Sequence, residues 1–200
     1  MNNDRKAAWI LFILAAIEGS WVLLNLHING VRFFRYLGFI PHVGGTALGW
    51  SLAFIVSALY VGLAARLPSV RENLFRISWL KLLGLTVAIS AGILEEVMFR
   101  RWLMNYLQDQ RGAGIIVQII ASGVVFGALH GVWGLMGKSV RAALGATIAT
   151  GLLGVALAGV FIASGRNLAP CIVAHFLINA LAEPGLVLAA TRGEMRRRPA

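Results

Sequence analysis

The chain is poor in charge, in acidic residues and in cysteine. Charged residues make up 13% of its 200 residues, whereas a soluble globular domain has about 25%. So few charges beside 58% hydrophobic residues leave too little polar surface for a water-soluble protein. The single cysteine, Cys171, excludes a disulfide within the chain and a zinc site built from several cysteines. The mean hydropathy of +0.78 instead predicts a membrane protein.

Several schemes for hydrolysis inside a membrane lack their residues in this sequence. A His-Glu-x-x-His string is absent, which argues against a zinc metalloprotease helix. An aspartyl pair needs two aspartates within the membrane, but the only aspartates are Asp4 and Asp109. Ser90 and Ser122 lie in apolar stretches without the Gly-x-Ser-x-Gly surroundings of a serine hydrolase. The net charge is +10, but the basic residues behind it lie between apolar stretches rather than together on one face or arm. This distribution does not indicate nucleic-acid binding.

Six apolar stretches predict an all-α fold, a polytopic membrane helix bundle of about six transmembrane helices that forms a single membrane domain over residues 1–200. They run approximately over residues 8–26, 44–65, 82–107, 113–137, 142–163 and 168–190. A span needs roughly 20 apolar residues, and none of the stretches alternates as barrel strands do. Residues 27–43 mix aromatic and basic side chains, which is typical of an interfacial segment. The first stretch follows Arg5 and Lys6 as a signal peptide would, but it resumes after Glu18, so we expect a retained helix.

Basic residues between the stretches predict how the chain lies in the membrane. With the N-terminus inside, the inner segments hold Arg5, Lys6, Arg66, Arg71, Arg76, Lys81, Lys138, Arg141, Arg192, Arg196, Arg197 and Arg198. The outer set is half as large and consists of Arg32, Arg35, Arg100, Arg101, Arg111 and Arg166. Lysine and arginine are enriched on the cytoplasmic side of membrane proteins. The sequence therefore predicts that both termini are cytoplasmic.

Two adjacent carboxylates, Glu95 and Glu96, lie near the middle of the third stretch. A charge at mid-depth costs on the order of 2.5–3.5 kcal/mol, so such a pair indicates a partner or a function. The four-residue spacing from Glu96 to Arg100 predicts an ion pair, whereas Glu95 lies about 100° around the helix and has no such partner. Glu96 is thus expected to be structural and Glu95 to be free for chemistry. Two alternatives are that Arg100 neutralises both, or that the helix slides outward to the headgroups.

Three more polar side chains interrupt otherwise apolar helices. His130 ends the string Phe126-Gly-Ala-Leu-His130, and His175 shares a helix face with Asn179. We expect the three to converge on Glu95, although a lone core histidine is more often a packing residue. A carboxylate in an apolar site is a competent base, a histidine can share its proton, and a histidine with an amide can stabilise an oxyanion. This set suits attack of water on an amide, or ligation of Zn.

These strings resemble the CPBP family, also called Abi or type II CAAX prenyl proteases. The family signature of Glu-Glu-x-x-x-Arg, Phe-x-x-x-His and His-x-x-x-Asn matches Glu95-Glu96-Val-Met-Phe-Arg100, Phe126-Gly-Ala-Leu-His130 and His175-Phe-Leu-Ile-Asn179 in order. The segment Ser164 to Pro170 is similar to the family's lead-in to the last motif. The resemblance implies a glutamic-type intramembrane endopeptidase, a CAAX-type hydrolase. Its active-site cavity lies among the last four helices, within a motif-bearing core of approximately residues 79–190.

The resemblance also implies a role for each motif residue. Glu95 and His130 activate water, and His175 with Asn179 forms the oxyanion hole. The supporting residues are Glu96, Arg100 and Phe126. A scheme without cofactor is favoured; a divalent metal such as Zn on Glu95, His130 and His175 is the alternative.

The expected partners are membrane lipid and a membrane-associated peptide or protein, prenylated or not, and no nucleic acid. An alternative function is a non-catalytic bacteriocin-immunity or scaffold protein of the same fold. A third is a proton-coupled transporter that uses Glu18, Glu95 and Glu183 as acids in the membrane, although the chain lacks the symmetric repeats of transporters.

Overall fold

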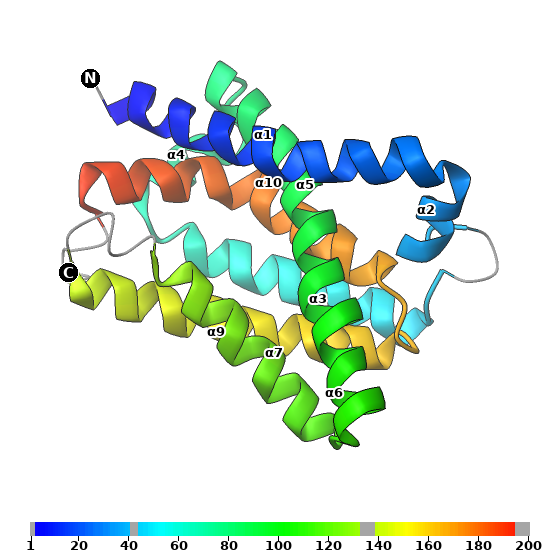
Figure 1. Ribbon diagram of the computed structural model, residues 1–200. Helices are drawn as coiled ribbons and strands as arrows, with labels where there is room; N and C mark the ends of the chain where they lie inside the picture. The colour runs from blue at the N-terminus through cyan, green and yellow to red at the C-terminus, as the bar shows by residue number, and fades with distance from the viewer. Residues whose placement is uncertain (1–2, 41–43, 133–138, 195–200) are drawn as a thin grey trace.

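The computed structural model describes residues 3–40, 44–132 and 139–194, and these residues form helices without a strand (Figure 1). In chain order the elements are α1 (Asn3–Asn29), α2 (Val31–Leu37), α3 (Ala47–Ala64), α4 (Pro68–Asn73), α5 (Trp79–Glu96), the π-helix η1 (Val97–Met104), α6 (Asn105–Arg111), α7 (Ile115–His130), α9 (Val140–Ala163) and α10 (Ala169–Arg192). The predicted all-α fold is confirmed.

Among the described residues, five helices are long and apolar enough to cross a membrane. They are Asn3–Asn29, Ala47–Ala64, the continuous run Trp79–Arg111, Val140–Ala163 and Ala169–Arg192. The apolar helix Ile115–His130 is shorter, and part of the stretch predicted for it lies outside the described residues. Large hydrophobic side chains are exposed along α1, α3, α7 and α9, where lipid rather than water is the fitting solvent. The chain is therefore a multi-pass membrane bundle.

Local sequence signals explain where several helices begin and end. The side-chain oxygens of Thr46, Ser78 and Ser139 cap α3, α5 and α9, because each accepts a hydrogen bond from the backbone N–H three residues later. Gly112 and Gly193 end α6 and α10 with φ of 59° and 73°, a left-handed conformation that glycine adopts without a steric penalty.

Helix α10 lies inside the bundle, in contact with α1, α3, α4, α5 and α9. Its residues Cys171 and Ile178 share a buried core with Leu157 and Phe161 of α9. Pro184 interrupts α10 and cannot donate a backbone hydrogen bond to the preceding turn. The ammonium of Lys81 donates to the carbonyl of Leu181 in that turn at 3.2 Å. This bond ties α5 to α10 beside the proline, whereas the carbonyl that lacks its helical donor because of Pro184 is that of Ala180.

The first and last helices meet at one end of the bundle (Figure 1). Arg192 Nη2 of α10 lies 3.3 Å from Asp4 Oδ1 of α1. Helix α1 begins and α10 ends at the same end of the bundle, which agrees with an even number of membrane crossings. The side of the membrane on which these two ends lie stays a prediction. Four of the basic residues behind that prediction lie outside the described residues, namely Lys138, Arg196, Arg197 and Arg198.

The glycine-rich stretch from Gly145 to Gly159 predicts close approach of neighbouring helices, and the structure places this approach between α7 and α9. A Cβ on Gly127 of α7 would lie 2.4 Å from the Thr147 carbonyl oxygen, and one on Gly154 of α9 would lie 2.9 Å from Gly123 Cα. Gly145 and Gly159 have open space instead. Glycines on only one face of α9 therefore set how closely α7, which carries His130, can pack.

We predict that Gly127→Ala destabilises the bundle by about 1–3 kcal/mol, because the added methyl group overpacks the contact with the α9 backbone. Equilibrium unfolding in mixed detergent micelles measures the change. The matched control is Gly145→Ala, where the methyl group meets open space and better helix propensity adds about 0.5–1 kcal/mol at most. Equal effects of the two substitutions would show that α7 and α9 are not in close contact.

Candidate active site

The two motif glutamates end α5, and the helix continues without a break as a π-helix. Glu95 and Glu96 are the last residues of the α-helical part, and Val97–Met104 forms η1. Figure 1 shows this run as one green helix that descends across the bundle. π-Helical turns are rare and are frequent at functional sites. The sequence does not predict this element, because its residues resemble those of an ordinary amphipathic α-helix.

The predicted pairing of Glu96 with Arg100 is confirmed. Both side chains are completely buried, and Arg100 Nε lies 3.1 Å from Glu96 Oε2. Neither of these two atoms has an aligned hydrogen-bond partner among the described residues, so the contact is an ion pair. Arg100 Nη2 also donates to the Gly154 carbonyl of α9 at 3.2 Å. The charges inside the membrane therefore neutralise each other and join η1 to α9.

His175 of α10 lies between the two glutamates. Its Nδ1–H donates to Glu96 Oε1 at 2.7 Å, and its Nε2 lies 3.7 Å from Glu95 Oε2. The ring is buried, with 3% of the side chain exposed. Sequence spacing assigns Glu96 to Arg100 alone, so the second partner of Glu96 is a new finding. Through His175, the structural carboxylate orients a ring that also faces Glu95.

His130 of α7 approaches Glu95 from a different helix. Its Nδ1–H donates to the Phe126 carbonyl at 2.8 Å, which directs Nε2 to within 3.7 Å of Glu95 Oε2. This is the oxygen that His175 also approaches, and it is buried without a hydrogen-bond partner among the described residues. The side chains of Glu95 and His130 are 19% and 22% exposed. The expected convergence of these groups is present, and a reactant can reach its edge.

Phe126 contacts most of the polar groups of the site. Its ring stacks on His130 with centroids 4.3 Å apart, and meets His175 edge-on at 5.8 Å. The guanidinium carbon of Arg100 lies 5.0 Å from the ring centroid, within range of a cation–π interaction. Phe99 packs against the opposite edge at 5.0 Å. A single buried aromatic ring thus fixes the distances between three charged or ionisable side chains.

Asn179 is not brought into direct contact with the other motif residues. It lies one turn after His175 on α10 and is partly buried. Within the described part of the chain, its amide forms no hydrogen bond with Glu95, His130 or His175. Asn179 lies on the same face of α10 as His175, so its amide is on the side of the helix that faces the site. The role of Asn179 stays a prediction.

Two further acids lie near Glu95, although sequence analysis gave neither a catalytic role. Glu18 of α1 accepts a hydrogen bond from Ser90 Oγ of α5 at 3.2 Å. Glu18 and Glu183 interact electrostatically with each other and with Glu95. Glu183 Oε2 is buried and has no partner among the described residues. All four acids of the apolar stretches therefore gather in one region, which only the crossing of α1, α5 and α10 reveals.

The geometry of the site does not fit a bound metal ion. In residues 3–40, 44–132 and 139–194, no group of three or more His, Cys, Asp and Glu side chains is arranged to hold one. His175 directs both ring nitrogens at carboxylates, and His130 commits Nδ1 to a backbone carbonyl. The two histidines approach the same oxygen of Glu95, each with Nε2 at 3.7 Å.

The helices that carry these residues match a known family of membrane proteases. The type II CAAX prenyl endopeptidase Rce1-like family matches residues 77–181, slightly more than half of the chain. The chain belongs to this family. No curated protein and no solved structure matches it. The match confirms the resemblance inferred from the three motifs and includes every motif residue from Glu95 to Asn179. It leaves out α1, α2 and Glu183.

We predict that Arg100→Met in this CAAX endopeptidase relative lowers the free energy of unfolding by about 3–5 kcal/mol, because it leaves Glu96 buried without its ion-pair partner. The measurement is equilibrium unfolding in detergent. The double variant Glu96→Gln with Arg100→Met is the control, and should lose less than the single variant because no charge is left unpaired. Additive losses from the two substitutions would contradict the pairing.

Proposed function

We propose that this protein is an intramembrane endopeptidase that hydrolyses a peptide bond of a membrane-associated peptide or protein, with water activated by Glu95. The observation that supports it is the approach of two imidazole nitrogens to one carboxylate oxygen, each at 3.7 Å. The family match supports a protease of the CAAX type. Serine and cysteine nucleophiles are absent from the cluster, and Cys171 is buried in the core. Direct attack by water is the chemistry that remains for these side chains.

In this scheme Glu95 and His130 act on the same water molecule. A separation of 3.7 Å between His130 Nε2 and Glu95 Oε2 is too long for a direct hydrogen bond, and one water can bridge the two groups beside it. Glu95 removes a proton as the water oxygen forms a bond to the scissile carbonyl carbon. The same proton is then delivered to the leaving nitrogen as the C–N bond breaks. The products are a carboxylic acid and an amine, which become a carboxylate and an ammonium when the second water proton passes to the amine, and Glu95 returns to its ionised form.

His175 and Asn179 are assigned to the developing oxyanion. In its imidazolium form, held by Glu96 through Nδ1, His175 offers an Nε2–H donor on the side of Glu95. The amide of Asn179, one turn further along α10, supplies a second donor. Donors fixed before the reaction stabilise the tetrahedral intermediate without reorganisation, an effect of roughly 3–4 kcal/mol for one oxyanion donor. The role of Glu96 is then to position His175, and that of Arg100 is to neutralise Glu96.

The substrate class follows from the membrane location of the site. Glu95 and His130 are partly exposed on helices whose other faces present large apolar side chains. A substrate therefore approaches through the bilayer or along a polar opening between helices. Membrane lipid surrounds the enzyme, and a prenylated or otherwise membrane-associated peptide is the partner that fits.

We predict that Glu95→Gln lowers the rate of peptide hydrolysis by about 10²–10⁴-fold, the usual contribution of a general base. Purified protein in proteoliposomes is given a library of fluorogenic peptides, and cleavage is followed with time. The matched control is Asp109→Asn, which makes the same change of charge on an exposed turn of α6. Cleavage by the Glu95→Gln protein at the control's rate would refute the role of Glu95.

A further inference from the structure

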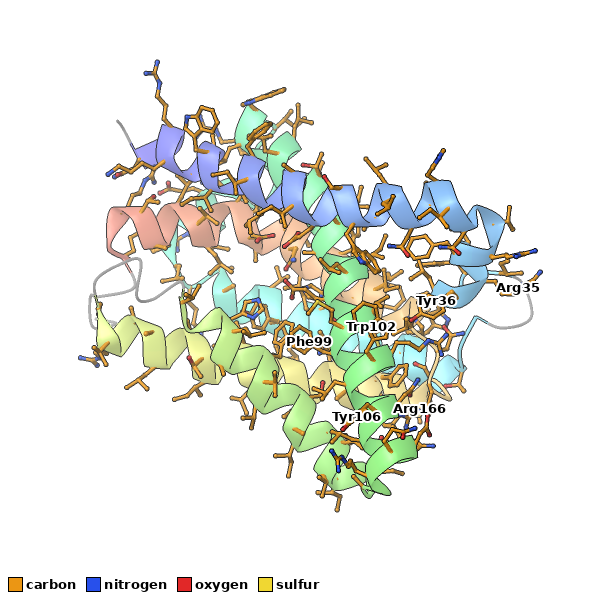
Figure 2. All side chains as sticks on the ribbon, viewed as in Figure 1. Arg35, Tyr36, Phe99, Trp102, Tyr106 and Arg166 are labelled. Atoms are coloured by element: carbon orange, nitrogen blue, oxygen red, sulfur yellow. The ribbon has the colours of Figure 1, made fainter. Side chains whose placement is uncertain are left out.

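A half-open chamber of ≈ 340 Å³ lies between α1, α2 and η1. Its lining residues are Trp21, Asn25, Asn29, Arg32, Phe33, Tyr36 and Trp102. Figure 2 shows Tyr36 of α2 next to Trp102 of η1 at this end of the bundle. Ligand pockets in proteins start at about 300 Å³ and combine apolar walls with a few directed polar groups. The chamber has both properties, and the proposed hydrolysis does not use it.

Contacts between its aromatic residues hold the chamber open. Trp21 meets Phe33 and Trp102 edge-on, each with centroids 6.1 Å apart. Trp102 Nε1 donates to the Tyr36 hydroxyl at 3.1 Å. Arg101 donates to the Tyr36 carbonyl at 2.7 Å and lies over the Tyr36 ring at 4.8 Å. The walls are therefore fixed before any ligand arrives, which lowers the entropic cost of binding.

Two asparagine amides of the chamber are arranged in a row. Trp21, Asn25 and Asn29 follow one another at four-residue intervals on one face of α1. Asn25 Nδ2 donates to the Trp21 carbonyl at 2.9 Å, and Asn29 Nδ2 donates to the Asn25 carbonyl at 3.1 Å. One N–H of each amide is engaged by the helix, so each amide offers Oδ1 and its second N–H to a ligand. Their separation along the axis is about 6 Å.

An extended peptide fits this row. In a β-conformation, backbone N–H groups point to the same side at every second residue, about 6.6 Å apart. This repeat is close to the spacing of the two amide oxygens, and the aromatic walls suit an apolar side chain. Arg32 is the one basic residue of the lining and complements an acidic side chain at the rim. A phosphate group is held best by several cations directed at one point, and the lining of the chamber has one cation, Arg32.

The chamber also lies at a useful distance from the proposed base. Trp102 follows Glu95 by seven residues in the same continuous run, which is at most about 10 Å along the axis because the π-helical part rises less per residue than an α-helix. Three residues of extended peptide span about 10 Å and therefore cover this distance. On α1, Trp21 follows Glu18 by three residues, and Glu18 bonds to Ser90 of the helix that carries Glu95. The same two helices thus border both the catalytic cluster and the chamber.

We infer that the chamber between α1, α2 and η1 is a substrate-docking site that binds an extended peptide segment about three residues away from the scissile bond. This inference rests on the proposed function. All of its lining residues except Trp102 lie outside the part of the chain that matches the family. The site therefore determines which substrates this protein selects, separately from the chemistry of hydrolysis.

The test compares two substrates on three proteins. One peptide cleaved by the unaltered protein is used whole, and again truncated so that it no longer reaches the chamber. We expect the unaltered protein to favour the whole peptide in kcat/KM by about tenfold to hundredfold, as two hydrogen bonds and an apolar contact allow. In the double variant Asn25→Ala with Asn29→Ala, that preference falls toward one, through a higher KM for the whole peptide.

The matched control is Ser20→Ala. Ser20 is exposed on α1 and also donates to the carbonyl four residues earlier, but it does not line the chamber. Removal of its bond should keep the preference for the whole peptide. A double variant that keeps the full preference overturns the docking site, and so does one that loses cleavage of both peptides to the same extent.

A second measurement separates this inference from the proposed function. Short synthetic peptides that carry benzophenone are cross-linked to the Glu95→Gln protein, and the sites are mapped by mass spectrometry. Cross-links at Trp21 or Trp102 without hydrolysis by the unaltered protein would support docking and refute the protease. Hydrolysis with cross-links only elsewhere would overturn docking. A phosphatidylglycerol molecule that is retained by the unaltered protein and lost from the double variant, without peptide cross-links, would show a lipid site instead.

Discussion

The structure depends on the ion pair of Glu96 and Arg100, both of which are completely buried in a membrane bundle. A buried charge without its partner is strongly destabilising, so these two side chains must stay together in the folded state. Other polar atoms of the pair reach two further helices, since Arg100 Nη2 binds the Gly154 carbonyl of α9 and Glu96 Oε1 binds His175 of α10. The requirement to neutralise one charge therefore fixes three helices relative to each other. It also leaves His175 facing Glu95, so the electrostatic constraint and the catalytic geometry have the same origin.

The fourth helix of the site, α7, is held by a different kind of contact. No Lys, Arg, Asp or Glu lies within it. It packs against α9 through glycine faces, and Phe126 fills the space between its own His130 and the ion pair. Shape rather than charge thus places His130 Nε2 beside Glu95. Because Phe126 also lies against Arg100, a change in the α7–α9 packing would move this nitrogen together with the surroundings of the ion pair.

The sequence predicted features that depend on a single helix, and missed most of those that depend on two. The pairing of Glu96 with Arg100 follows from a four-residue spacing, and the structure confirms it. The contact of His175 with Glu96 joins α10 to α5, and no spacing rule relates residues on different helices. Likewise, the glycines of α9 were expected to allow close packing, but only helix rotation decides that Gly154 faces α7 and Gly145 does not. The π-helix after Glu96 was missed because its residues carry no mark that distinguishes them from an α-helix.

The neighbours of Glu95, the proposed base, come from inside and from outside the part of the chain that matches the family. Glu95 receives its histidines from α7 and α10, within the family match, whereas its acidic neighbours Glu18 and Glu183 lie outside it. The α1 helix that brings Glu18 to Ser90 also forms one wall of the chamber. A relative with the same motifs but a different first helix would therefore place its counterpart of Glu95 beside different polar neighbours and a different chamber. In the function proposed above, the motif residues perform the hydrolysis, and the first helix contributes to the choice of substrate.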